Sequence, residues 1–254
     1  MSLDEGVRYV DGGWSSIVDR LRARAVGAGV TLAAGDAVTE VVLAPVSEGI
    51  AGTVARTADG QVLRSASTLV AAGSPAVADR LFGLGDHYRS LAGPPVEASV
   101  LDLGLTAPPP VGAHLGLDRA LCATVHSVAA GLAPDGLHLA SLARYRRPGD
   151  GLAPDDTREL LLAHGREMGI DPEAIAMERY LHQLTVTWGM PTAERGGLAG
   201  RPPVAVPDRP GLFVAGDWVG PRGLLADAAA ASAADAVAAI VSAHDRRSST
   251  LVVS

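Results

Sequence analysis

The sequence has 254 residues, of which 48% are hydrophobic, so it is long enough for one large domain or two small ones with a substantial core. Only 4% of the residues are aromatic, and we therefore expect a core of Ala, Val and Leu. The formal net charge of −7 argues against a nucleic-acid partner, because phosphates require a basic face. The single cysteine, Cys122, excludes an intramolecular disulfide and fits a reducing cytoplasm.

The first third of the chain is predicted to begin with a helix and continue as short strands. Apolar residues at helical spacing, followed by glycine, predict a helix over 14–28. Apolar runs bounded by turn residues predict strands at 30–32, 38–43, 50–56, 61–64 and 68–72. The last of these is continuously apolar, which is typical of a parallel strand covered on both faces. A short helix is expected over 75–81.

The middle of the chain has the pattern of an antiparallel sheet. Apolar alternation predicts strands at 96–105, 121–128 and 137–145. The run Asp155-Asp156-Thr157 is expected to cap a helix that runs to Met168 and is stopped by Gly169. Residues 174–186 fit either a helix or a strand, and the connection at 195–210 is rich in glycine and proline.

The most informative stretch lies near the C-terminus. Residues 211–215 have the composition of a buried strand, Gly216 and Asp217 form a turn after it, and residues 223–225 lead into an alanine-rich helix. A helix N-terminus offers free backbone N–H groups and the positive end of the helix dipole. The pattern therefore predicts a polar or anionic ligand at this strand–helix junction.

Two segments carry a family resemblance. Leu212–Gly216 with Asp217, followed by Leu224–Ala228 and Ser232, resemble the C-terminal flavin-binding motif of the amine oxidase and phytoene desaturase superfamily of FAD enzymes. Near the N-terminus, Tyr9–Trp14 and the segment 29–41 resemble the mid-chain part of that family. The two matches occur in the family's order, and the region between them is similar to the phytoene desaturase branch more loosely.

The resemblance implies FAD as cofactor and assigns roles to six residues. Asp217, after Gly216, would hydrogen-bond the ribityl chain, and the backbone of Gly223, Leu224 and Leu225 would face the flavin ring. The remaining residue, Val38, would pair through its backbone with the adenine. The alternatives are ordinary structure: a helix cap or turn carboxylate for Asp217, a plain helix start for residues 223–225, and a core valine for Val38.

One departure from the family concerns the pyrophosphate. The family opens with a strand, a G-x-G-x-x-G turn and a helix, and this sequence contains no such motif. We therefore expect the C-terminal part of a larger flavoprotein, whose dinucleotide-binding segment is supplied in cis or in trans. The expected fold mixes α/β and α+β: an incomplete Rossmann-like FAD-binding layer over 1–82 and 204–246, and an antiparallel-sheet substrate domain over 83–203. Uncovered apolar surface would favour self-association.

The function that follows is an FAD-dependent oxidoreductase that moves a hydride from an apolar substrate to flavin N5. The sequence has no lysine and few aromatic residues, which favours the phytoene desaturase branch over amine oxidases. The alternatives are a non-catalytic binding remnant and one subunit of a split flavoenzyme. No catalytic residue is assigned, and the chain alone is expected to be inactive.

The remaining residues with chemical potential are the histidines. His126 and His138 fall on predicted neighbouring strands, where they would line a substrate pocket or serve only a structural role. None of the seven histidines has the close spacing of a zinc site, so no metal is expected. The apolar run 224–243 is interrupted by Asp227 and Asp235, which makes it a poor membrane span, although peripheral contact with a membrane stays open for a lipid substrate.

Overall fold

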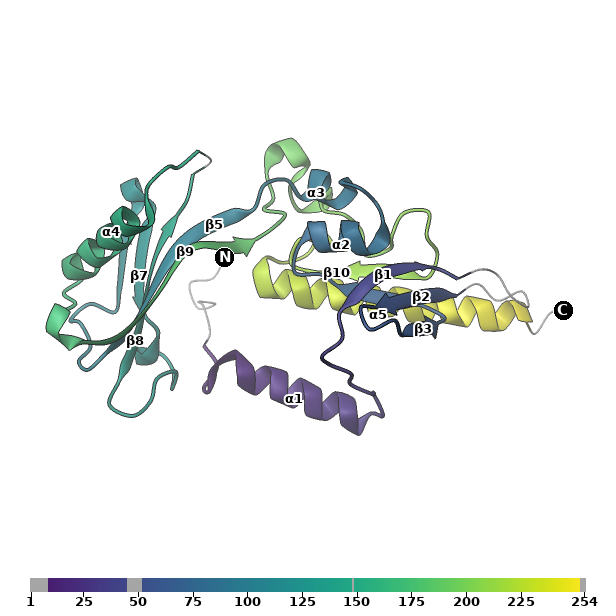
Figure 1. Ribbon diagram of the computed structural model, residues 1–254, viewed down its shortest axis with the longest axis horizontal. Coiled ribbons are helices and arrows are strands. Elements are labelled where there is room, and N and C mark those ends of the chain that lie inside the picture. The colour runs from purple at the N-terminus through teal and green to yellow at the C-terminus, as the bar shows by residue number, and fades with distance from the viewer. Residues whose placement is uncertain (1–8, 45–51, 148, 252–254) are drawn as a thin grey trace. The chain divides into compact units, whose positions relative to one another are not determined.

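The computed structural model describes residues 9–44, 52–147 and 149–251, which form two compact units (Figure 1). One unit combines the described residues up to Leu32 with Glu97–Val186, and the other combines Ala33–Val96 with the residues from Thr187 onward. Each has its own hydrophobic core. The mixture of an α/β unit and an antiparallel unit agrees with the expected fold class.

The borders of these units differ from the expected 1–82, 83–203 and 204–246. The N-terminal helix belongs with the antiparallel sheet, because the N–H of Gly12 donates to the carbonyl of Gly131 at 3.2 Å and Asp11 accepts from the N–H of Gly131 at 2.9 Å. Residues 83–96 belong with the α/β unit, because Tyr88 and Ala92 are part of its core.

The antiparallel unit is built on a five-stranded sheet in the order β6-β7-β8-β5-β9. Its strands are β5 (Val96–Leu105), β6 (Ala113–Gly116), β7 (Leu121–Val125), β8 (His138–Tyr145) and β9 (Ile175–Thr187). The prediction for β5 is confirmed residue for residue, and β9 settles the open segment 174–186 as one long strand. The strand predicted over 121–128 ends early, at Val125, where a 3₁₀ turn (His126–Val128) begins.

Helix α4 (Pro154–Glu167) packs against β7 and β8, and its Leu161 joins Leu101 and Leu142 in the core of this unit. The prediction that Asp155 caps this helix is wrong. Ala153 is the cap residue and Pro154 takes the first helical position, where a missing N–H costs nothing. Asp155 instead lies in the first turn, where its charge favours the helix dipole.

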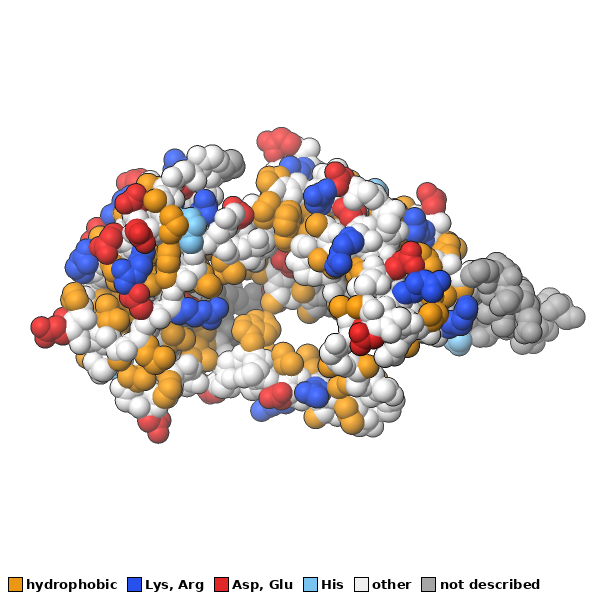
Figure 2. Space-filling view, in the orientation of Figure 1, with side chains coloured by type: hydrophobic (Ala, Val, Ile, Leu, Met, Phe, Trp, Pro, Cys, Tyr) orange, Lys and Arg blue, Asp and Glu red, His pale blue; other side chains and the backbone are white. Residues whose placement is uncertain are grey.

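Helix α1 (Gly13–Gly27) confirms the predicted N-terminal helix and begins after Gly12, whose φ is 78°. None of its residues is buried, and Trp14, Val18 and Leu21 are exposed, so hydrophobic side chains reach the surface along it (Figure 2). The strand predicted at 30–32 is wrong, because these residues are exposed and pair with no strand in the described part of the chain.

The α/β unit contains two small sheets. β1 (Val38–Leu43), β2 (Thr53–Thr57) and β3 (Val62–Ser65) form the predicted antiparallel meander; Ile50 and Ala51 of the expected second strand lie outside the described residues. β4 (Thr68–Ala71) and β10 (Leu212–Ala215) pair in parallel, with Leu212 opposite Thr68 and Ala215 opposite Ala71. Segments about 140 positions apart therefore meet in one sheet, as predicted.

The expectation that the strand at 68–72 is covered on both faces is wrong. β10 is fully buried, because Val204 and Val206 hydrogen-bond along its other edge and the C-terminal helix packs against it. β4 has a ladder neighbour on only one edge among the described residues, and it is half-buried with Ala71 exposed.

Three helices complete this unit: α2 (Pro75–Phe82), α3 (His87–Ala92) and α5 (Leu225–Leu251). α2 confirms its prediction and starts at Ser74, whose hydroxyl accepts from the N–H of Val77. α3 has no apolar periodicity and was not predicted. It forms because the buried carboxylate of Asp79 accepts the N–H groups of Tyr88 at 2.8 Å and Arg89 at 3.0 Å.

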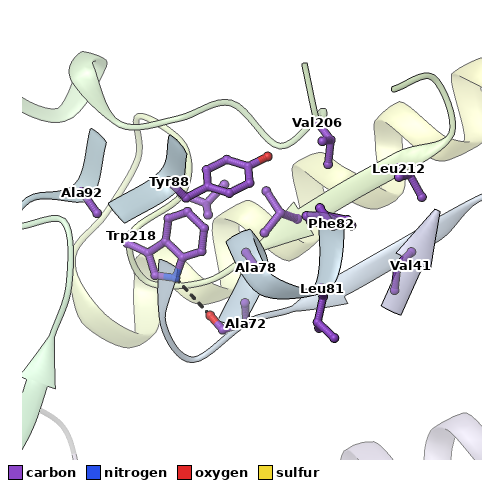
Figure 3. Packing of buried hydrophobic residues seen from close by; sticks show 12 residues of the cluster. Val41, Ala72, Ala78, Leu81, Phe82, Tyr88, Ala92, Val206, Leu212 and Trp218 are labelled. Atoms are coloured by element: carbon purple, nitrogen blue, oxygen red, sulfur yellow. Dashed lines mark hydrogen bonds between the residues drawn. The ribbon is translucent and has the colours of Figure 1, made fainter. Parts of the chain in front are cut away.

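The core of the unit centres on Trp218, Tyr88 and Phe82, all of which are almost completely buried (Figure 3). Tyr88 meets the indole edge-on, with ring centroids 5.2 Å apart. Three of the nine Phe, Tyr and Trp residues of the sequence thus lie together in this core, beside the end of β10.

By length and composition alone, residues 225–246 of α5 could cross a membrane, contrary to the sequence-based expectation. In the structure, Ala228, Ser232 and Ala236 of this helix are buried, and the helix packs against β10. Only 17% of the apolar window is buried, and a single helix of this kind is weak evidence for a membrane span.

Candidate cofactor site at the end of the parallel strands

The two parallel strands end at the same edge of their sheet, and the backbone there is unusually close. A Cβ on Gly216 would lie 2.7 Å from the carbonyl oxygen of Ala72, closer than any side chain allows. The indole N–H of Trp218 donates to the same Ala72 oxygen at 3.0 Å (Figure 3). Glycine at 216 is therefore needed to bring the ends of β4 and β10 together.

Helix α5 is fixed to this edge by one hydroxyl. The N–H of Gly216 donates to Ser232 Oγ at 3.1 Å, and that Oγ lies 2.9 Å from the carbonyl oxygen of the same glycine. Ser232 is 1% exposed. The second turn of α5 is thereby held against the end of β10.

The turn that leads into α5 is not a plain helix start. A Cβ on Gly223 would lie 2.9 Å from the backbone N of Ala228, and the φ of this glycine is +71°. Leu225 also has a left-handed backbone, with φ 53°, which is uncommon for a residue that carries a side chain. Such strain persists where surrounding structure imposes it, and it concentrates at ligand sites.

The side chain of Arg201 also holds this turn in place. Its guanidinium donates to the carbonyl of Gly223 at 3.0 Å and to that of Gly189 at 2.9 Å, and the residue is 8% exposed. Burial lowers the pKa of Arg201, and the charge of Asp217 acts in the opposite direction. Sequence reasoning missed this residue because it lies in a glycine- and proline-rich connection without periodicity.

Asp217 is partly buried beside these groups. Its Oδ2 accepts a hydrogen bond from the hydroxyl of Thr187 at 2.6 Å. Within the described ranges no hydrogen bond reaches its Oδ1. This oxygen is therefore available to accept a hydrogen bond from a ligand. Among the described residues, no hydrogen bond makes Asp217 a cap of α5. Thr187, at the end of β9, is a second residue that the sequence did not single out.

Val38 lies in the same unit but in the other sheet. It is the first residue of β1, opposite Thr57, and it is 37% exposed, so it is not a core valine. β1 is an edge strand in the sheet order, and an edge is what backbone pairing with a base requires. The structure thus brings together Gly216, Asp217 and residues 223–225. Val38 lies in another sheet, and no hydrogen bond among the described residues joins it to them. The cofactor roles of all six stay predictions.

The two histidines proposed for a substrate pocket have different surroundings. His138 is the first residue of β8 and lines a mostly apolar cavity of about 270 Å³ within the antiparallel unit. Other residues that line this cavity include Leu103, Leu132, Leu137, Leu139 and Met177. A cavity of this lining suits a small apolar group.

The placement of His126 on a strand is wrong, since it follows β7 in a 3₁₀ turn and does not line that cavity. Its Nδ1 lies 3.0 Å from the hydroxyl of Tyr9. Burial lowers the pKa of His126, and the nearby Asp102 opposes this shift. The contact with Tyr9 links His126 to the N-terminal segment, and a place for His126 in a substrate pocket stays a prediction.

The fold has clear counterparts among solved structures. An oxidoreductase from Methanosarcina mazei matches 89% of this chain and 54% of its own, with a TM-score of 0.66 and 18% identity. A triple variant of putrescine oxidase with redesigned cofactor binding matches with a TM-score of 0.60, 13% identity and coverages of 93% and 53%. A flavoprotein/dehydrogenase from Cytophaga hutchinsonii matches with a TM-score of 0.50, 15% identity and coverages of 92% and 55%.

The chain therefore has the fold of about half of these flavoprotein and oxidoreductase structures, and it spans about half of their length. No protein-family model and no curated protein matches the sequence. At such low sequence identity, the structural similarity establishes the fold alone. The family resemblance noted in the sequence is therefore confirmed at the level of the fold.

Proposed function

We propose that this chain is the C-terminal portion of an FAD-dependent oxidoreductase, nearest to the phytoene desaturase branch. The observation that carries the proposal is the junction after β10. Two required glycines, a strained helix entry and a carboxylate oxygen that has no donor among the described residues occur together there. Strand ends of α/β sheets are the usual place for such ligands. When bound, the flavin would supply the redox chemistry by accepting a hydride at N5.

The residues of the junction fit parts of this cofactor. Asp217 would accept a hydroxyl of the ribityl chain through Oδ1, while Thr187 keeps the carboxylate oriented through Oδ2. The backbone at Leu224 and Leu225 would offer N–H groups to the polar edge of the ring, in the field of the α5 dipole. Val38 would pair with the adenine through its backbone at the open edge of β1.

For the substrate, the proposal is a small apolar molecule. The cavity beside His138 is lined mostly by aliphatic side chains and supports this class. The cytoplasm is the proposed compartment, in keeping with the single cysteine. The pyrophosphate of FAD would be held by a dinucleotide-binding segment outside this sequence, joined to it or supplied by a partner, because no glycine-rich turn of that kind is present.

The test is an FAD titration followed by visible spectroscopy and size-exclusion chromatography. We expect the isolated chain to bind FAD weakly and without turnover, and to bind it stoichiometrically once extended by its natural upstream sequence or mixed with a dinucleotide-binding partner. Tight 1:1 binding by the isolated monomer would overturn the assignment of the pyrophosphate. Failure of every form to bind FAD would overturn the flavin assignment itself.

A further inference from the structure

A second group of chemically reactive side chains lies in the antiparallel unit, between β6 and α4. The imidazole of His114, on β6, stacks on that of His164, on α4, with ring centroids 4.7 Å apart and an interplanar angle of 22°. His164 is completely buried, and His114 is half-buried. The two residues are 50 positions apart, so the linear spacing of histidines gave no sign of the pair.

Each of these imidazoles has one buried nitrogen without a hydrogen-bond partner in the described part of the chain: His114 Nδ1 and His164 Nε2. The other nitrogen of His164, Nδ1, lies 3.3 Å from Glu167 Oε2. In the neutral tautomer in which Nδ1 donates its proton to this carboxylate, His164 Nε2 presents a lone pair. A buried lone pair without a donor is destabilising unless something fills the site.

Glu167 is itself held in place. Both of its oxygens accept from the guanidinium of Arg119, at 3.0 and 2.5 Å. A carboxylate that fixes the proton on one nitrogen of a histidine, so that the other nitrogen faces a shared centre, is the outer-shell arrangement found behind metal-binding imidazoles. One ligand atom from each of His114, His164 and Glu167 lies within 4.8 Å of the others.

We propose that His114 Nδ1 and His164 Nε2 bind a late first-row divalent metal ion, represented by Zn²⁺, with Glu167 orienting His164 and water completing the shell. Imidazole is the ligand type that zinc, copper and nickel share. Two nitrogens on one tetrahedral zinc are about 3.3 Å apart, given Zn–N bonds of about 2.0–2.1 Å. The two ring planes are nearly parallel in the stack, so the half-buried His114 would turn out of the stack to bring its Nδ1 to this separation from His164 Nε2. The ion would then fasten β6 to α4.

The experiment uses the complete chain without a histidine tag, treated with chelator and then dialysed. Zn²⁺ is titrated by calorimetry, Co²⁺ is followed by its visible absorption, and thermal unfolding is measured with and without Zn²⁺. We expect saturable 1:1 binding, a Co²⁺ spectrum with nitrogen ligands and a higher Tm with metal. Adventitious weak binding, with several equivalents and no change in Tm, would overturn the proposal.

Three variants locate the site. His114→Ala should abolish the saturable binding and the Tm increase, and Glu167→Gln should weaken binding by roughly 10–100-fold, as outer-shell changes do. The matched control is His87→Ala, because His87 is exposed and lies in the other unit. Equal binding by His114→Ala and the parent chain would contradict the assignment. If His114→Ala does not fold, Glu167→Gln decides, because it is isosteric and its residue lies near the surface.

Discussion

The indole N–H of Trp218 donates to the backbone oxygen of Ala72 across 3.0 Å, and so joins two residues that are 146 positions apart. This bond and the parallel pairing of β4 with β10 align the ends of both strands. Gly216 lies between the two partners, with its backbone too close to the Ala72 oxygen to carry a side chain. The shape of the candidate cofactor junction thus depends on a contact between distant parts of the chain.

Gly216→Ala should destabilise the protein, because its methyl group would lie 2.7 Å from the Ala72 oxygen and 2.7 Å from the indole nitrogen of Trp218. Overpacking of this kind costs about 1–3 kcal/mol. The free energy of unfolding, measured by urea denaturation, checks this. Gly73→Ala is the matched control, since no atom lies within 4 Å of a Cβ at that position; equal losses in both variants would contradict the argument.

Arg201→Met should also lower stability, because the carbonyl oxygen of the buried Gly189 loses its donor inside the protein, and that of the exposed Gly223 loses a hydrogen bond. A buried acceptor left unpaired, as at Gly189, costs about 1–3 kcal/mol. Arg222→Met, at an arginine whose side chain is 60% exposed, should change the free energy of unfolding far less. A neutral Arg201→Met would mean that the turn before α5 is held by other contacts.

Asp217→Ala should weaken FAD binding in a form of the protein that binds the cofactor. Losing a hydrogen bond to a carboxylate costs about 1.5–3 kcal/mol, or roughly a 10- to 150-fold rise in Kd. The control is Asp235→Ala. It removes a carboxylate on α5 that forms an exposed ion pair with Arg222. An unchanged Kd for Asp217→Ala would return Asp217 to a structural role beside Thr187.

The half-buried His126 should make stability depend on pH. Its pKa in the folded state is lowered from 6.5, so the unfolded state takes up this proton first as the pH falls. Its contribution is complete above pH 6.5 and is lost as the pH falls from there through the folded pKa. His126→Gln should therefore flatten the loss of unfolding free energy between neutral and mildly acidic pH, relative to the parent chain and to His87→Gln. Parallel curves for all three proteins would contradict this account.

Some elements could be predicted from the sequence because their own residues carry the pattern of a strand. The alternation in 96–105 and the apolar run in 212–215 each determine a strand, and the parallel pairing of β4 with β10 could be expected from their composition and the glycine after each. The glycine turn with Asp217 could likewise be recognised, because its residue types are dictated by backbone geometry.

Features built from tertiary contacts could not be predicted in this way. Helix α3 depends on Asp79 accepting its first N–H groups, and nothing within 87–92 encodes this. Arg201 and Thr187 reach the junction only after β9 and the following connection have folded. The pairing of His114 with His164 also requires β6 and α4 to meet.

The exposure of helix α1 has a consequence for its dynamics. It is fastened at its start, where Asp11 and Gly12 bond to Gly131, but none of its 15 residues is buried. A helix of this length without tertiary support is only marginally stable in water. Its amide hydrogens should therefore exchange with deuterium through local fraying, long before those of β5 or β10, which open only with the unit around them. Protection of α1 that appears only in a larger assembly would report directly on whatever covers it there.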